Sequence, residues 1–69
     1  MKIALIGASG MAGSAILDEA LNRGHQVTAL ARNPARVPAR AGVTVAALDV
    51  LDADAVRAAV AGHDAVISA

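Results

Sequence analysis

Apolar residues gather in four short runs, each of a length typical of one buried strand. The runs extend from Lys2 to Ile6, from Val27 to Ala31, from Val43 to Leu48 and from Ala65 to Ser68. The first is apolar after its lysine, as expected for a central parallel strand that is covered on both faces. Between the runs, apolar residues recur with helical spacing from Met11 to Arg23 and from Ala53 to about Ala61. The pattern predicts strands and helices in alternation.

The first predicted helix is rich in alanine. Its expected apolar stripe consists of Ala12, Ala15, Ile16, Ala20 and their neighbours. Gly24 stands where a left-handed C-terminal cap belongs. The helix should therefore pack on the strands through this stripe and end before Gly24.

The second predicted helix begins after Asp52, whose carboxylate can accept hydrogen bonds from the free N–H groups of the first turn. Its expected buried side is formed by Val56, Ala59 and Val60. Two prolines interrupt the stretch from Arg32 to Ala41, so this crossover should be a loop with at most a turn or two of helix.

Strands and helices that alternate with short connections require parallel pairing and right-handed crossovers. We expect an α/β fold of four parallel strands in the order third, second, first, fourth, with two main helices and a short or irregular third crossover. This is the first part of a Rossmann-like, doubly wound sheet.

Composition excludes several classes of function. The 69 residues include no cysteine, and the six basic and six acidic residues cancel, which leaves no long-range attraction for nucleic acid or an anionic membrane. Two histidines far apart do not suggest a zinc site. No apolar stretch reaches the length of a membrane span or a secretory signal, so we expect a cytoplasmic protein without bound metal.

A glycine-rich turn, Gly7-Ala8-Ser9-Gly10-Met11-Ala12-Gly13, connects the first strand to the first helix. Gly7 ends the strand, Gly10 allows close contact with a ligand, and Gly13 lets the helix lie close to the sheet. The backbone N–H groups of Met11 and Ala12 can then bind a pyrophosphate. The alternative interpretation is a plain tight turn, but the strand before it and the helix after it favour a phosphate site.

The end of the second strand indicates which dinucleotide binds. A protein that binds NAD usually has an acidic residue there for the ribose hydroxyls, whereas this chain has Ala31 followed by Arg32. Arg32 and Arg36 can hold a 2′-phosphate through charge-assisted hydrogen bonds, and the hydroxyl of Ser9 can add another. NADPH is therefore favoured over NADH. The arginines could instead be solvated loop charges, and Ser9 could bond its own backbone.

Four segments together resemble the atypical short-chain dehydrogenase/reductase family, especially the relatives of flavin reductase, biliverdin reductase B and the NmrA-like regulators. They are the glycine turn, Ala31-Arg32-Asn33-Pro34-Ala35-Arg36, Leu48-Asp49-Val50-Leu51-Asp52 and Gly62-His63-Asp64-Ala65-Val66-Ile67-Ser68-Ala69.

The resemblance implies an NAD(P)-binding Rossmann domain, of which residues 1–69 would be the N-terminal part. It adds Asn33 to the cofactor loop, an adenine contact from the Asp49 carboxylate, and a ring contact from the backbone of Val50. Asp49 could instead only organise the loop before the second helix. Ser68 would lie near the nicotinamide half.

Many relatives reduce carbonyls with a Tyr acid and a nearby Lys, but this chain has no Tyr and its only Lys is Lys2. We therefore expect no catalytic residue. Three hypotheses remain: the NADPH-binding portion of a flavin- or quinone-reductase-like enzyme with negligible turnover of its own, a dinucleotide-sensing module, or a truncated or engineered half-sheet that binds nothing well. Self-association through the edge of the fourth strand is expected under all three.

Overall fold

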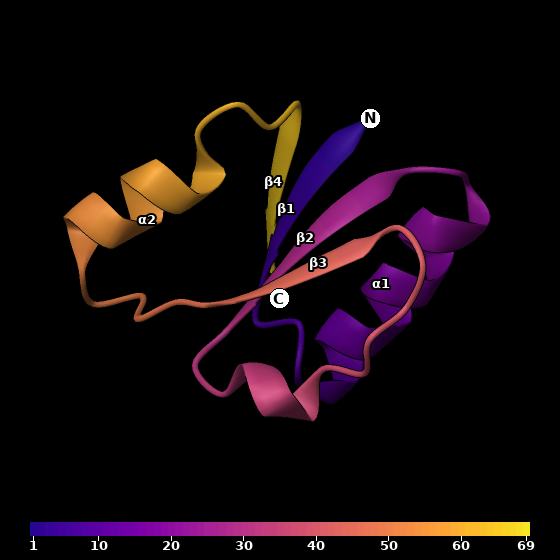
Figure 1. The fold of residues 1–69 in the computed structure, drawn as a ribbon, viewed down its shortest axis with the longest axis horizontal. Helices are drawn as coiled ribbons and strands as arrows, with labels where there is room; N and C mark the ends of the chain where they lie inside the picture. Colours follow the sequence, from indigo (N-terminus) through magenta and orange to yellow (C-terminus); the bar gives the residue numbers. More distant parts are fainter.

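The computed structural model describes residues 1–69 and contains seven short elements. Figure 1 shows how they are arranged. In chain order they are β1 (Lys2–Ile6), α1 (Met11–Asn22), β2 (Gln26–Ala31), the 3-10 turn η1 (Pro34–Arg36), β3 (Val43–Ala47), α2 (Ala53–Val60) and β4 (Ala65–Ser68). Each predicted boundary is correct to within one residue. The crossover expected to be irregular contains η1 alone.

The four strands form one parallel sheet in the order β3-β2-β1-β4, as predicted. In this register Ile6 is opposite Leu30 on one side and Ser68 on the other, and Ala31 is opposite Ala47. The C-terminal ends of all four strands therefore meet at one edge. The fold is an α/β Rossmann-like sheet.

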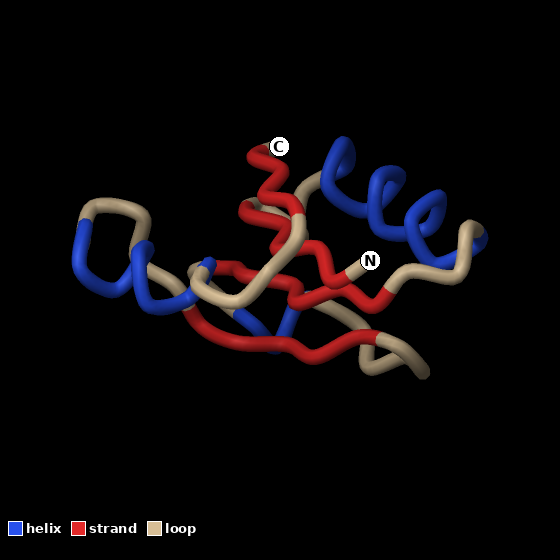
Figure 2. Tube along the Cα trace, turned by 90° about the horizontal axis from the view of Figure 1, so that it is seen from above, coloured by secondary structure: helices blue, strands red, loops and turns tan.

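Alternate residues of each strand point to opposite faces of the sheet, and a separate apolar cluster lies on each face. On one face, residues such as Leu5 and Ala29 pack with Leu17 of α1. On the other, Ala4 and Leu30 pack with the half-buried side of α2. Figures 1 and 2 show the two helices on opposite sides of the sheet. The chain is thus a thin, three-layer unit in which β1 and β2 are the best covered strands.

The apolar stripe predicted for α1 is wrong at two of its positions. Ala12 and Ala15 are exposed, whereas the buried residues of the helix are Gly13, Leu17 and Ala20. The reason is the close approach of Gly13 to the end of β1, which turns the face at positions 13, 17 and 20 toward the sheet. Alanine fits either side of a helix, so its spacing did not reveal this rotation.

The ends of both helices agree with the sequence. The Oδ1 atom of Asp52 accepts a hydrogen bond from the N–H of Ala55 at 3.1 Å, as an N-cap does. Val56, Ala59 and Val60 lie on the side of α2 that packs on the sheet, as predicted, but they are only half-buried. Gly24 follows α1 with a φ of 81°, in the left-handed region. Neither helix has the length and apolar character needed to span a membrane.

Candidate functional site

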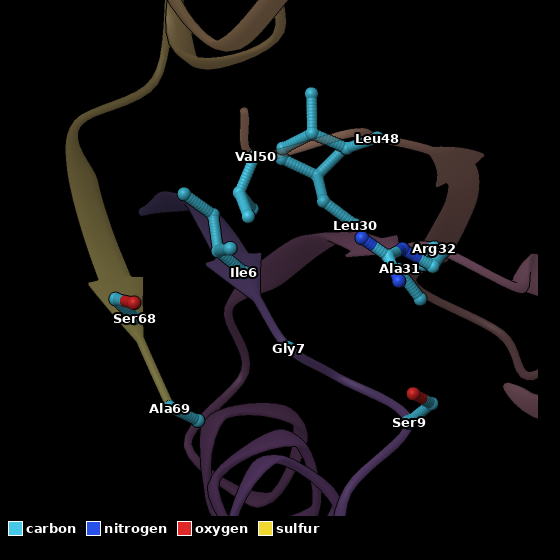
Figure 3. Close-up of a pocket in the computed structure, with 10 residues that line it drawn as sticks. All are labelled: Ile6, Gly7, Ser9, Leu30, Ala31, Arg32, Leu48, Val50, Ser68 and Ala69. Carbon is cyan, nitrogen blue, oxygen red and sulfur yellow. The ribbon is translucent and has the colours of Figure 1, made fainter. Parts of the chain in front are cut away.

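A cavity of about 410 Å³ opens at the edge where the strands end (Figure 3). The residues that line it are Ile6, Gly7, Ser9, Leu30, Ala31, Arg32, Leu48, Val50, Ser68 and Ala69. They come from the ends of β1, β2 and β4 and from the segments that follow β1, β2, β3 and β4. Its volume is within the range of small-molecule sites. In a sheet of this kind, the C-terminal edge is where ligands bind.

The floor of the cavity is shaped by Gly7, which has a φ of 84°. Its N–H donates to the carbonyl oxygen of Leu30 at 2.9 Å, which fixes the turn to the end of β2. A Cβ at this position would lie 2.7 Å from the carbonyl oxygen of Ala69, so a side chain is excluded by space as well as by dihedral angle.

Gly13 holds the start of α1 against that turn. A Cβ on Gly13 would lie 2.2 Å from the carbonyl oxygen of Gly7 and 2.9 Å from the Cα of Ala8. Both neighbours are backbone atoms, which cannot move aside without moving the strand end. The structure thus has the close packing of helix against strand end that the sequence predicted for Gly13.

Gly10 differs from the other two glycines of the turn. Its φ is −81°, and a Cβ there would meet nothing within the chain closer than the carbonyl oxygen of Gly7 at 3.7 Å. The fold itself therefore gives no reason for glycine at this position. A ligand that approaches the backbone closely would give one.

The first turn of α1 presents backbone donors without acceptors. No side chain caps the helix at Gly10, and the N–H groups of Met11, Ala12 and Gly13 have no acceptor within the chain. The turn carries no acidic residue. These three amides and the positive end of the helix dipole favour an anion at this place.

Arg32 is the cation of the cavity. It follows the last residue of β2, is exposed, and belongs to none of the three ion pairs of the chain, which use Arg23, Arg40 and Arg57. No acidic side chain lines the cavity. Its guanidinium is therefore available for an anionic group.

Asn33 and Arg36 also follow β2, but neither lines the cavity. Both are exposed, and Arg36 closes η1 without an ion pair. Of the two arginines suggested by the sequence, Arg32 has the better position for a bound phosphate.

Two serines line the cavity from opposite sides. Ser9 and Arg32 lie on one side, and Ser68 and Ala69 on the other (Figure 3). The hydroxyls of both serines have no hydrogen-bond partner within the chain, so Ser9 does not bond its own backbone here. Ser9, Arg32 and Ser68 are the polar side chains of the lining.

The segment after β3 contributes apolar surface. The Oδ1 atom of Asp49 accepts from the N–H of Leu51 at 3.0 Å, and Asp49 does not line the cavity. This turn leaves Val50 in the lining, 57% exposed, next to the buried Leu48. The carboxylate thus organises the loop, as the alternative interpretation of this residue had it.

Sequence reasoning missed four lining residues: Ile6, Leu30, Ala31 and Leu48. Each is the last residue of a strand, its neighbour, or the residue just beyond it. The rule that parallel strands end at one edge could have identified them. Their apolar side chains suggested only core packing.

Comparison with known families gives a match over most of the chain. A family model described as NAD(P)H-binding matches residues 7–69, from the first glycine of the turn to the last residue. Among curated proteins, the uncharacterized protein YwnB of Bacillus subtilis (strain 168) is 62% identical over 37 residues, which are 54% of this chain and 17% of YwnB.

Solved structures share the fold over the whole chain. The structure named "putative epimerase" from Bacteroides thetaiotaomicron has 51% identity and a TM-score of 0.91, and the match covers 99% of this chain and 32% of that one. The structure named "putative NADH-flavin reductase" from Streptococcus pneumoniae TIGR4 has 40% identity and a TM-score of 0.81, covering 100% of this chain and 30% of that one. The chain therefore spans about a third of these structures and less than a fifth of YwnB.

Proposed function

The chain belongs to the NAD(P)H-binding family, and we propose that it binds NADP(H) as the first portion of a Rossmann-type domain of an oxidoreductase. The observation that carries this is the set of three unpaired amides at the start of α1, beside a cavity whose only charged side chain is Arg32. The structure named as an NADH-flavin reductase supports the choice of an oxidoreductase.

The glycine turn fits a pyrophosphate. Met11 and Ala12 would donate their N–H groups to it, because neither their side chains nor any cap competes for these donors. Gly10 leaves room for the phosphate oxygens, and Gly7 and Gly13 keep strand and helix close together. A negative group gains from the helix dipole at the same place.

The adenosine half would lie on the side of Arg32. A 2′-phosphate there can accept charge-assisted hydrogen bonds from the guanidinium and a further bond from the Ser9 hydroxyl. NAD would find no carboxylate for its ribose hydroxyls at the end of β2. We assign a smaller role to Arg36 and Asn33, because neither lines the cavity.

Val50 and Leu48 offer apolar surface for the adenine ring, and Asp49 would act through the turn that it holds. Its free carboxylate oxygen could still accept from the adenine amino group. Ser68, on the opposite side of the cavity, would lie toward the nicotinamide half. The absence of a nucleic-acid partner belongs to the same proposal and rests on the net charge of zero. The cytoplasmic location stays an expectation from the sequence, based on its short apolar runs.

When bound, NADPH supplies a hydride to an acceptor, and the residues of this chain bind and orient it. Ser9, Arg32 and Ser68 are the polar side chains of the cavity, and none of them is a proton donor of the Tyr–Lys kind. The second candidate is a module that senses the dinucleotide without reducing a substrate, and reductase activity of a longer protein that contains this chain would distinguish the two. In either case the isolated chain should have negligible turnover with flavin or quinone acceptors.

Calorimetric titration of the chain with NADPH and with NADH tests the proposed function. We expect both to bind, with NADPH tighter by roughly tenfold or more, since one charge-assisted contact to the 2′-phosphate is worth about 1.5 kcal/mol or more. The pair 2′,5′-ADP and 5′-AMP should reproduce this difference on the adenosine half alone. Equal affinities for NADPH and NADH would contradict the proposed contact to the 2′-phosphate. Failure of both dinucleotides to bind would contradict the proposed function.

A further inference from the structure

The segment that carries both candidate arginines is held at both ends by buried residues. It extends from Arg32 to Arg36, between Ala31 at the end of β2 and Val37 just after η1. Ala31 is 3% exposed and Val37 is 5% exposed. The carbonyl oxygen of Ala31 also accepts a hydrogen bond from the N–H of Leu48 at 3.0 Å. The backbone that leaves β2 must therefore return to the core as soon as η1 ends.

Val37 enters the core on the α1 side of the sheet. Its side chain belongs to the apolar cluster that also contains Ala8 of the glycine turn, Leu17 of α1 and Ala31 of β2. No other residue from 32 to 42 is buried. Val37 thus connects the loop after β2 to the same cluster that supports the glycine turn.

Local features give the segment a defined shape. The N–H of Arg36 donates to the carbonyl oxygen of Asn33 at 3.1 Å, and the N–H of Val37 donates to that of Pro34 at 3.1 Å. Pro34 begins η1, and its ring fixes the backbone φ angle there. A segment of fixed shape needs little further ordering when a ligand binds.

A second contact holds the later part of the loop. Arg40 forms an ion pair with Asp18 of α1, and the two side chains are 40% and 58% exposed. Ion pairs this exposed contribute little to stability. Arg40 also lies beyond Val37 in the chain, farther from the arginines that face the proposed ligand. The burial of Val37 is therefore the main constraint on the segment.

We propose that Val37 is a positioning residue for the preference for NADPH, although its side chain does not line the cavity. The inference rests on the proposed function. Because Val37 holds η1 against the core, it fixes the path of the backbone and keeps the Arg32 guanidinium beside the cavity before the dinucleotide binds. Without this constraint, the arginine must be ordered during binding, which weakens affinity by roughly two- to tenfold. NADH has no 2′-phosphate, so its affinity should not change.

Calorimetric titration of Val37→Ala with NADPH and NADH tests the inference, with Val27→Ala as the matched control. Val27 belongs to the same cluster and is 2% exposed, but it lies near the start of β2, at the end of the sheet opposite the cavity. Both variants should lose stability to a similar degree, which urea unfolding measures. The ratio of NADPH to NADH affinity should fall by roughly two- to tenfold in Val37→Ala alone, and Val37→Ile should retain it.

A second pair of variants leaves the core unchanged. Pro34→Gly loosens the start of η1, whereas Pro38→Gly makes the same change at an exposed residue outside the segment. Only Pro34→Gly should lower the affinity ratio. Hydrogen exchange at the Arg36 amide reports on the segment without any ligand, and it should be faster in Val37→Ala and Pro34→Gly than in the unmodified chain.

The outcomes separate this inference from the proposed function. Equal affinities of the unmodified chain for NADPH and NADH would contradict the contact to the 2′-phosphate and this inference with it. If the unmodified chain prefers NADPH and a folded Val37→Ala variant prefers it equally, or Val27→Ala loses the preference as well, only the role of Val37 is overturned. If Val37→Ala does not fold, an unchanged ratio in Pro34→Gly overturns that role.

Discussion

Replacing Gly13 with alanine is expected to unfold most of the chain and to abolish dinucleotide binding. The added methyl group would lie 2.2 Å from the carbonyl oxygen of Gly7, and relief requires α1 to move away from the end of β1. We expect a cost of about 3 kcal/mol or more, at the upper end of measured overpacking effects. The whole free energy of unfolding of a domain this small is roughly 3 to 10 kcal/mol. Urea unfolding followed by circular dichroism measures the loss.

Two alanine variants in the same segment serve as controls. Ser14→Ala changes the next, exposed residue of α1 and should leave both stability and binding nearly unchanged. Gly10→Ala should fold, because its Cβ has room within the chain, but should bind NADPH at least about tenfold more weakly, because the methyl group occupies space needed by the phosphate. A stable Gly13→Ala chain that still binds NADPH would contradict the role given to this glycine.

Replacing Arg32 with alanine is expected to remove the preference for NADPH. Loss of one or two charge-assisted hydrogen bonds should weaken NADPH binding by roughly 10- to 150-fold, from about 1.5 to 3 kcal/mol, while NADH affinity changes little. Arg32 is exposed and forms no ion pair, so its loss should not destabilise the fold. Calorimetric titration of the variant with both dinucleotides measures the effect.

Arg36→Ala is the closest control, since Arg36 is also an exposed, unpaired arginine of the same loop but lies outside the cavity lining. We expect a smaller loss of NADPH affinity than for Arg32→Ala. Arg57→Ala on α2 controls for a general change of charge and should have no effect on binding. Parallel losses of NADPH and NADH affinity in Arg32→Ala would show that this side chain does not read the 2′-phosphate.

The fold was predictable because the residues that start and end its strands and helices act locally in the sequence. Gly7 ends β1, the Arg32-Asn33-Pro34 sequence ends β2, and Asp52 starts α2 through its own side chain. These signals act over a few residues, so sequence alone located each boundary to within one position. The buried side of α1 was not predictable in this way, because it depends on how closely Gly13 approaches a different element.

The site was predictable only in part. Backbone positions at strand ends follow from topology, which is why Gly7, Arg32 and Ser68 were found and do line the cavity. The direction of a side chain after a strand depends on the turn that follows. After β3, the N–H of Leu51 donates a hydrogen bond to the Asp49 carboxylate and so fixes this turn. As a result, Val50 rather than Asp49 lies in the cavity lining.

The most direct test of the account is an NMR titration of the ¹⁵N-labelled chain with NADP⁺, which follows every backbone amide separately. Saturable shifts that are largest at the amides of Met11 and Ala12, with further shifts at Arg32, are the predicted result, since these groups would donate to the two phosphate positions. The account is contradicted if the cofactor leaves these amides unchanged or shifts chiefly residues at the opposite end of the sheet, such as Gln26 and Thr44.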